Sequence, residues 1–315
     1  MKKITKMMML VFLASVLFLM GGCQEKTTKK ETLKIVSTIF PGYDFAKQIT
    51  GTNADVTLLL RPGMESHSYD PTPQDIIQIK NADVFLYVGG ESDQWVDGIL
   101  DTIDTSRTKV IKMMDSVDKV EEEVVEGMQK EEEESKTDEP EYDEHVWTSP
   151  RNAIQILNTI ADAVIAQDQS HQKQYEINRD AYQKQLETLD SEFKEVVKNG
   201  SRTELVFGDR FPLRYFVEEY NLSYVAAFPG CSSDTEANAS TIAFLINKVK
   251  QNKIPVVFYI ELSNQKIANT IAEATGAKTL EFHTAHNVTK EEFNKGITYL
   301  SIMQNNVKVL KEALF

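Results

Sequence analysis

Four of the five histidines in this sequence fall where predicted secondary-structure elements begin or end. His67 follows a predicted strand at residues 55–60, and His283 and His286 follow another at 277–282. His145 precedes a predicted helix, at the end of a long acidic run. Neutral imidazole is a good ligand for Zn²⁺, and carboxylates bind Zn²⁺ or Mn²⁺. These histidines therefore suggest a transition-metal site.

Two carboxylates share this placement. Asp209 directly follows a predicted strand at 203–208, and Glu261 ends one at 255–261. In open parallel sheets, ligands bind beyond the carboxyl ends of the strands, so these side chains are expected to face one cleft. None of them has tight motif spacing such as HExxH, so each residue alone is weak evidence. His171, in a predicted helix away from these ends, is expected to be exposed and without a role.

Strands and helices alternate in both halves of the chain. The apolar runs predicted to be strands lie at 32–40, 55–60, 83–90, 108–112, 203–208, 222–228, 255–261 and 277–282. Near-continuous apolar strands that alternate with helices indicate parallel sheets covered on both faces. A start signal supports the helix after 72: Thr72 is a good N-cap, Pro73 follows it, and Asp75 comes three residues after the cap.

One predicted helix is unusually long. Residues 171–198 contain no glycine or proline and place apolar side chains at helical spacing. The predicted fold class is therefore α/β, with two lobes, each a parallel sheet of about four strands flanked by helices, joined by one long helix. We expect an N-terminal lobe at 32–170, the connecting helix at 171–199 and a C-terminal lobe at 200–315. The alternative is that this helix belongs to a single larger sheet protein.

The N-terminus resembles an export signal. Three lysines precede a short apolar stretch that ends in Gly21, Gly22 and Cys23. This ending resembles a bacterial lipobox, so residues 1–22 are predicted to be removed, Cys23 to be lipidated and 23–31 to form a polar tether. The protein would then be anchored by lipid at the extracytoplasmic face of the cell membrane. The alternative is ordinary secretory cleavage. With Cys23 lipidated, Cys231 has no partner for an intramolecular disulfide.

The chain is acidic, with a formal net charge of −14. Nucleic-acid binding needs a basic face, so this composition argues against it. Much of the acid lies in a loop predicted at 115–144, which ends just before His145. Such a charge block repels itself and is expected to resist burial.

Three segments together resemble one family. PGMESHSYDPTPQDIIQIKNADVFLYVG, DEHVWTSPRNA and VSTIFPGYDFAKQIT are similar to segments of the cluster A-I solute-binding proteins, the zinc and manganese receptors of ABC importers. The likeness extends over essentially the whole mature chain. It implies a non-enzymatic, monomeric receptor whose partners are a metal ion and an ABC permease, and it implies that His67 and His145 are metal ligands.

At the other two ligand positions the sequence departs from the family pattern. The family's third ligand is a histidine, but this chain has FGDRFPLRYF there. Asp209 or a water could take that place; alternatively, Asp209 caps the next helix and pairs with Arg210. For the fourth ligand, usually Asp or Glu, we favour His283, with His286 as an outer partner or substitute. Glu261 is expected to bind the metal or to hold a ligand imidazole; alternatively, it is a solvated strand end.

The favoured function is capture of Zn²⁺ for an ABC importer, with Mn²⁺ as the alternative metal. Two further functions were weighed. An exported metal-dependent hydrolase would need an open metal position and a general base, and no paired base motif is evident. A surface adhesion lipoprotein with a structural metal would fail to fold without that metal.

Overall fold

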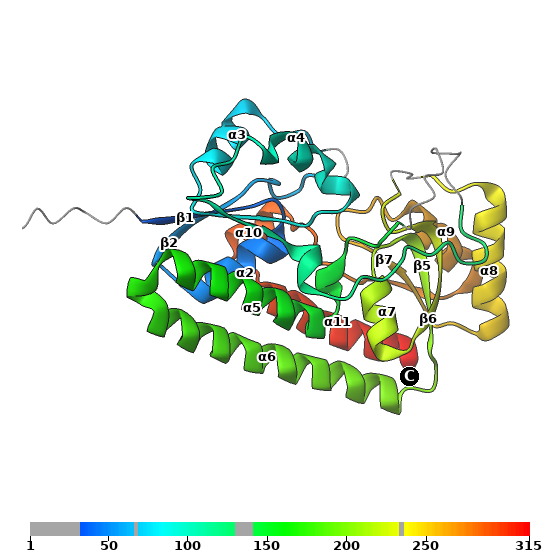
Figure 1. The fold of residues 1–315 in the computed structure, drawn as a ribbon. Coiled ribbons are helices and arrows are strands. Elements are labelled where there is room, and N and C mark those ends of the chain that lie inside the picture. Colours follow the sequence, from blue (N-terminus) through cyan, green and yellow to red (C-terminus); the bar gives the residue numbers. More distant parts are fainter. Residues whose placement is uncertain (1–31, 66–68, 130–140, 233–235) are drawn as a thin grey trace, which may run out of the picture. The chain divides into compact units, whose positions relative to one another are not determined.

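Two four-stranded parallel sheets form the framework of the computed structural model (Figure 1). The structure describes residues 32–65, 69–129, 141–232 and 236–315. The first sheet has the order β2-β1-β3-β4, and its strands are β1 (Leu33–Ser37), β2 (Ala54–Leu58), β3 (Val84–Tyr87) and β4 (Lys109–Lys112). The second has the order β6-β5-β7-β8, and its strands are β5 (Glu204–Phe211), β6 (Ser223–Pro229), β7 (Val256–Tyr259) and β8 (Lys278–Glu281). This arrangement confirms the predicted α/β class.

Helices cover both faces of each sheet. Around the first sheet lie α2 (Phe40–Thr50), α3 (Pro73–Lys80), the 3-10 helix η1 (Glu91–Val96), α4 (Asp97–Leu100) and α5 (Pro150–Gln167). Around the second lie α7 (Arg214–Tyr220), α8 (Ala239–Asn252), α9 (Lys266–Thr275) and α11 (Tyr299–Leu314), and α10 (Lys290–Asn294) precedes α11. Short 3-10 turns complete the list: η2 (Met113–Ser116), η3 (Val146–Thr148) and η4 (Gln169–His171).

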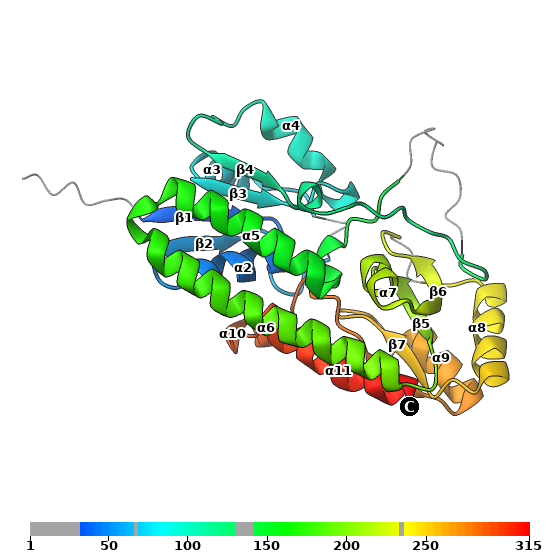
Figure 2. The same ribbon diagram turned by 60° about the horizontal axis from the view of Figure 1, so that its bottom comes forward.

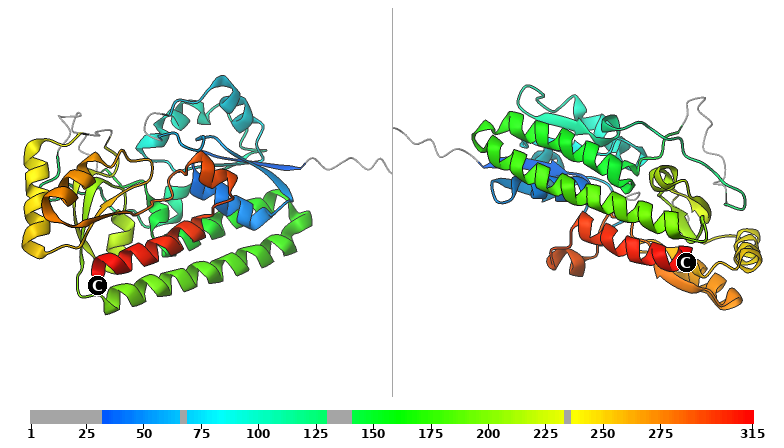
Figure 3. Two further views of the ribbon diagram at one scale, coloured as in Figure 1. Left: turned by 180° about the vertical axis from the view of Figure 1, so that it is seen from behind. Right: turned by 90° about the horizontal axis from the view of Figure 1, so that it is seen from below.

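The two sheets share one continuous apolar core. Side chains from the inner faces of both sheets, such as Ile35 and Phe258, belong to a single buried cluster with residues of α2, α5, α6 and α11. Smaller clusters lie on the outer faces, where α8 and α9 cover the second sheet (Figure 3) and α3 packs on the first. Because close-packed cores resist deformation, large rotations of one sheet against the other are disfavoured.

The long helix α6 (Gln172–Asn199) has 28 residues, roughly 40 Å at about 1.5 Å per residue. It packs against α2 and α5 at one end and α7 at the other, with α11 alongside (Figure 2). Its apolar stripe, including Tyr175, Tyr182 and Phe193, is buried. The predicted connecting helix is therefore confirmed.

Helix start signals behave as expected. Thr72 accepts a hydrogen bond from the backbone N–H of Asp75, and the Asp75 carboxylate accepts from the backbone N–H of Thr72, so the two form a capping box before Pro73. Ser149 caps α5 by accepting from the N–H of Asn152. The second cap fixes the point at which the chain turns from His145 into α5.

Two expectations about the chain path are wrong. Strand β5 does not end at residue 208 but continues to Phe211, with a register shift against β6 between Phe207 and Arg210. The acidic segment also packs where the structure describes it: Glu122 and Gln129 hydrogen-bond the second lobe, and Glu144 is fully buried. Backbone N–H groups hydrogen-bond these buried carboxyl groups: Gly230 donates to Glu122, and Ser92 donates to Glu144.

Within the described ranges, no helix has both the length and the apolar character needed to cross a membrane. The predicted signal, the lipidated Cys23 and the tether lie outside the described residues.

Candidate metal centre

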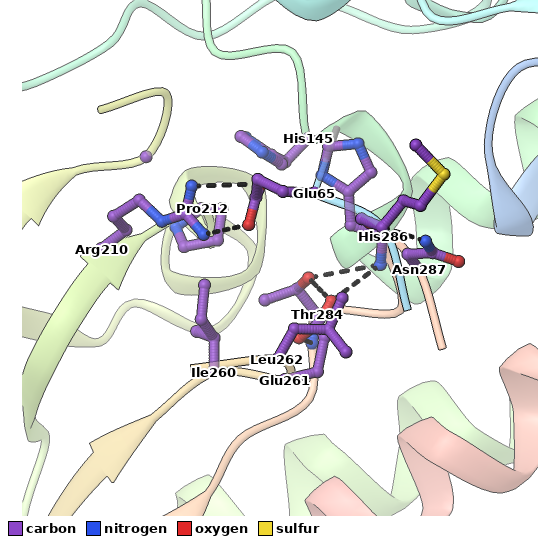
Figure 4. A pocket seen from close by; sticks show the side chains of 12 residues that line it. Glu65, His145, Arg210, Pro212, Ile260, Glu261, Leu262, Thr284, His286 and Asn287 are labelled. Carbon is purple, nitrogen blue, oxygen red and sulfur yellow. Dashed lines mark hydrogen bonds and ion pairs between the residues drawn. The ribbon is translucent and has the colours of Figure 1, made fainter. Parts of the chain in front are cut away.

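A small cavity of about 20 Å³ lies where the carboxyl ends of the two sheets meet (Figure 4). This volume is close to the space that one water molecule needs, so it suits a single small ion better than an organic ligand. The lining residues come from segments that follow strands, together with His145: Met64, Glu65, His145, Arg210, Pro212, Gly230, Ile260, Glu261, Leu262, Thr284, His286 and Asn287.

Two of the predicted histidines meet in this cavity. The ring centroids of His145 and His286 are 5.3 Å apart. Both residues are buried, with 1 % of the surface of His145 and 8 % of that of His286 exposed. Trp147 packs against both imidazoles, with its ring 5.5 Å from His145 and 5.0 Å from His286. The Trp147 indole N–H also donates to the carbonyl of Thr284 at 2.8 Å. The His-x-Trp motif thus supplies one imidazole and fixes the loop that carries the other.

The loop after β8 owes its shape to Glu261. The Glu261 carboxylate accepts from the backbone N–H of Thr284 at 2.7 Å, from its hydroxyl at 2.5 Å and from the N–H of His286 at 3.1 Å. Between these residues, Ala285 adopts a left-handed backbone with φ of 62°, a conformation that costs about 1 kcal/mol or more for residues other than glycine. This turn directs His286 toward the cavity. Glu261 is therefore a buried loop anchor at the cavity wall, and the solvated strand-end interpretation is wrong.

His283 lies outside the cavity lining, although it is buried beside Glu261. Its Nδ1 accepts from the backbone N–H of Ala285 at 2.9 Å and lies 3.5 Å from Glu261 Oε2. The side chain of Asn306 accepts a hydrogen bond from the backbone N–H of His283 and donates one to the carbonyl of His283. Within the part of the chain that the structure describes, His283 Nε2 has no hydrogen-bond partner.

Asp209 also lies outside the lining. Its carboxylate accepts from the backbone N–H groups of Arg210 at 2.9 Å and Ile260 at 3.4 Å, so it braces the ends of β5 and β7. It does not cap α7, whose N-cap is Leu213 without a side-chain bond. The guanidinium of Arg210 is bound instead to Glu65, with Nη1 3.3 Å from Oε1 and Nη2 2.9 Å from Oε2.

Buried acids surround His145. The Asp143 carboxylate accepts from the backbone N–H of His145 at 2.7 Å and lies 3.2 Å from its Nδ1. Burial, the largest single effect, lowers the pKa of His145, but the charge and hydrogen bond of Asp143, together with the charges of Glu144 and Glu122, raise this pKa overall. Glu122 accepts from the N–H of Gly230 at 2.7 Å, and burial raises the pKa of its carboxyl to about 8. Imidazole Nδ1 held by a carboxylate leaves Nε2 as the nitrogen for a metal.

The segment before His67 is docked on the second lobe. The Asn287 side chain donates to the carbonyls of Arg61 at 2.9 Å and Met64 at 2.8 Å, and the N–H of Gly63 donates to the carbonyl of Val288 at 2.8 Å. His67 itself lies outside the described residues. Among the residues that are described, no three His, Cys, Asp or Glu side chains converge closely enough to hold a metal.

Cys231 is a free thiol near the same acids. Burial, and then the charges of Glu144 and Asp143, raise its pKa well above the ordinary value. A thiol must lose its proton to bind a metal, so metal binding by Cys231 would have to overcome this raised pKa.

Comparison with known proteins identifies the family of this chain. The family model of the periplasmic component A of the zinc-uptake complex, ZnuA, matches residues 35–313. The chain belongs to the ZnuA family. Members of this family are components of a zinc-uptake complex, so the family assignment does not support the hydrolase alternative.

Similar relatives and structures cover most of the chain. It is 30% identical to the high-affinity zinc uptake system protein ZnuA of Bacillus subtilis, over 97% of both chains. It is 32% identical to the zinc-binding lipoprotein AdcA of Streptococcus pneumoniae, and it spans 58% of that protein's length. The Zn(II)-bound ZnuA-like domain of AdcA superposes with a TM-score of 0.74 at 32% identity, covering 90% of this chain and 99% of that domain. The metal-dependent lipoprotein YcdH of Bacillus subtilis superposes with a TM-score of 0.76 at 30% identity, with 90% of this chain and 100% of that one covered.

Several residues of the site were not singled out from the sequence. Glu65 and Asp143 each stand two residues before a predicted ligand, His67 and His145. This shared carboxylate-x-His spacing was a usable signal. Asn287 gave none, because its role depends on contacts with the other lobe.

Proposed function

We propose that this protein captures Zn²⁺ outside the membrane and delivers it to the permease of an ABC importer. The observation that carries the proposal is the meeting of His145 and His286 in one small cavity between the carboxyl ends of the two sheets. The zinc named for the similar proteins AdcA and ZnuA supports the choice of metal.

The proposed ligands are His67, His145 and His286. Three neutral imidazoles match the preference of Zn²⁺ for nitrogen donors and leave one position for water or a carboxylate. We propose Glu261 and His283 as outer residues that hold the His286 loop, because the Glu261 carboxylate is already engaged by three donors and His283 is not among the lining residues. Asp209 is proposed to brace the strand ends rather than to bind metal.

Release is proposed to depend on local loop movement. The continuous core and α6 oppose rotation of the sheets, whereas the segment after β2 and the loop after β8 are held by a limited set of hydrogen bonds. Transfer to the permease would therefore begin by freeing one imidazole, which speeds metal loss without unfolding either lobe.

The acidic chain and the predicted lipid at Cys23 fit this function. A negative surface raises the local concentration of cations, and salt screens this effect. A lipid anchor would keep a monomeric receptor beside its permease. The AdcA relatives of Streptococcus pneumoniae are named lipoproteins, and membrane fractionation of a Cys23→Ala variant tests the anchor.

The function is tested with protein purified without added metal. Elemental analysis should find zinc, and competitive titration should give tighter binding of Zn²⁺ than of Mn²⁺. Equal or weaker binding of Zn²⁺ would contradict a zinc receptor and favour the manganese alternative.

A further inference from the structure

We propose that Arg210 is a positioning residue for the metal site, acting through Glu65. This inference rests on the proposed function and deepens it. The pair would hold the segment that leads to His67 against the second lobe. In the family, a histidine at this strand end connects the second lobe to the site by binding the metal. In this chain, Arg210 would connect the second lobe to the site by an ion pair.

The ion pair joins two segments that are remote in the sequence. Arg210 is at the end of β5 and only 14 % of its side chain is exposed, whereas Glu65 follows β2. Both nitrogens at the end of the guanidinium reach separate oxygens of Glu65, and Nη1 also donates to the carbonyl of Ser232 at 3.3 Å. A two-point contact fixes the orientation of a carboxylate as well as its position.

A second set of bonds holds the same segment from the other side. Asn287, next to His286, donates to the carbonyls of Arg61 and Met64. Two elements of the second lobe therefore hold residues 61–65 in place. One is β5, which lacks the family histidine, and the other is the loop after β8, which carries His286. Figure 4 shows Arg210 and Glu65 at one side of the cavity and Asn287 at the other.

Direct binding of metal does not explain this pair. A guanidinium stays protonated and has no lone pair to offer. Glu65, His145 and His286 are not close enough, within the described part of the chain, to form a three-donor group. In this arrangement both oxygens of Glu65 face Arg210.

Charge alone predicts the opposite effect from positioning. Arg210 is a permanent cation at the edge of the cavity, so its removal should strengthen Zn²⁺ binding if it acts only by repulsion. If Arg210 positions the ligand segment, its removal should weaken Zn²⁺ binding, because ordering that segment then costs part of the binding free energy. The sign of the change separates the two.

The experiment compares Zn²⁺ affinity, by competitive titration, for Arg210→Gln, Glu65→Gln and the double variant of the full chain. We expect each single variant to lose about tenfold, and the double variant to lose no more than either single one, since one contact is removed in all three. Arg210→Lys, which keeps the charge but not the two-point contact, should lose affinity as well. An unchanged or increased affinity of Arg210→Gln would overturn the proposal.

A matched ion pair serves as control. Arg214 bonds Glu123 at 2.8 Å and is also 14 % exposed, but Glu123 lies in the acidic segment rather than before His67. Arg214→Gln should leave Zn²⁺ affinity unchanged.

Thermal unfolding of each metal-free variant checks the fold. If Arg210→Gln does not fold, Arg210→Lys and Glu65→Gln give the same test. A Co²⁺ absorption spectrum that changes in Glu65→Gln but not in Arg210→Gln would also overturn the proposal, because it would indicate that Glu65 itself is a ligand. Failure of the wild-type protein to bind Zn²⁺ at all would instead contradict the proposed function.

Discussion

The imidazole rings of His145 and His286 meet edge to face with their centroids 5.3 Å apart. One ring stands before α5, beside the first sheet, and the other follows β8 of the second sheet. Trp147 packs on both and hydrogen-bonds the loop of His286. The two lobes therefore meet at one cavity, to which each contributes an imidazole.

The carboxylate of Glu261 should be important for the His286 loop. Glu261→Gln replaces one carboxylate oxygen, which accepts from Thr284 or His286, with an NH2 group that cannot accept. We expect a loss of about 1–3 kcal/mol in unfolding free energy and weaker Zn²⁺ binding. Chemical denaturation and zinc titration measure the two effects, with Glu281→Gln at the end of β8 as the matched control. Equal stability of the two variants would contradict the anchoring role.

Metal preference should depend on the imidazole at position 286. Three nitrogen donors favour Zn²⁺, whereas oxygen donors suit Mn²⁺ better. His286→Asp should therefore lower Zn²⁺ affinity and narrow the ratio of Zn²⁺ to Mn²⁺ affinity by about tenfold or more. Competitive titration of both metals checks this. A larger change of the ratio in His283→Asp would assign the ligand to His283.

Zinc affinity should fall as the pH falls, because protonated imidazole cannot bind metal. Asp143 raises the pKa of His145, so the loss should begin above the ordinary value of about 6.5. In the metal-free protein, protonation of His145 has the opposite effect, because the charged pair of His145 and Asp143 stabilises the fold. This stabilisation is complete below the pKa of His145 in the unfolded chain and is lost as the pH rises through its pKa in the folded protein.

Zinc titration from about pH 5 to about pH 8 tests this dependence. Asp143→Asn removes the charge that raises the pKa of His145, so the midpoint should move to lower pH. An unmoved midpoint would show that His145 is not the group whose proton competes with zinc.

The acidic segment should contribute to stability. Glu122 accepts from the N–H of Gly230, the N–H of Gln129 donates to the carbonyl of Ala227 at 3.0 Å, and Met128 is buried. Replacing 121–129 with a Gly/Ser linker of equal length should cost on the order of 2 kcal/mol in unfolding free energy. Thermal unfolding measures it, and neutralising Glu131–Glu134, outside the described residues, controls for charge. A linker variant as stable as the wild type would contradict the observed packing.

Regular parts of the fold were predictable because burial imposes a pattern. Runs such as 83–90 and 255–261 are apolar on both faces, as parallel strands between helices must be, and Thr72 and Pro73 carry the chemistry of a helix start. Composition was a poorer guide to the acidic segment. It predicts self-repulsion but carries no information on a partner such as the N–H of Gly230.

The site was predictable only in part. His145 follows from its motif, but the choice between His283 and His286 depends on the left-handed Ala285 and on bonds to Glu261, which strand alternation does not encode. The role of Arg210 was missed for a similar reason. The longer β5, with its register shift, and a partner in the other lobe decide where its side chain lies.

Zinc titration of three alanine variants tests the central claim most directly. His145→Ala and His286→Ala should each lower Zn²⁺ affinity on the order of a hundredfold or more, as expected for lost ligands, whereas His283→Ala, an outer residue, should lose less, about tenfold. A loss in His283→Ala that exceeds the loss in His286→Ala would contradict the site described.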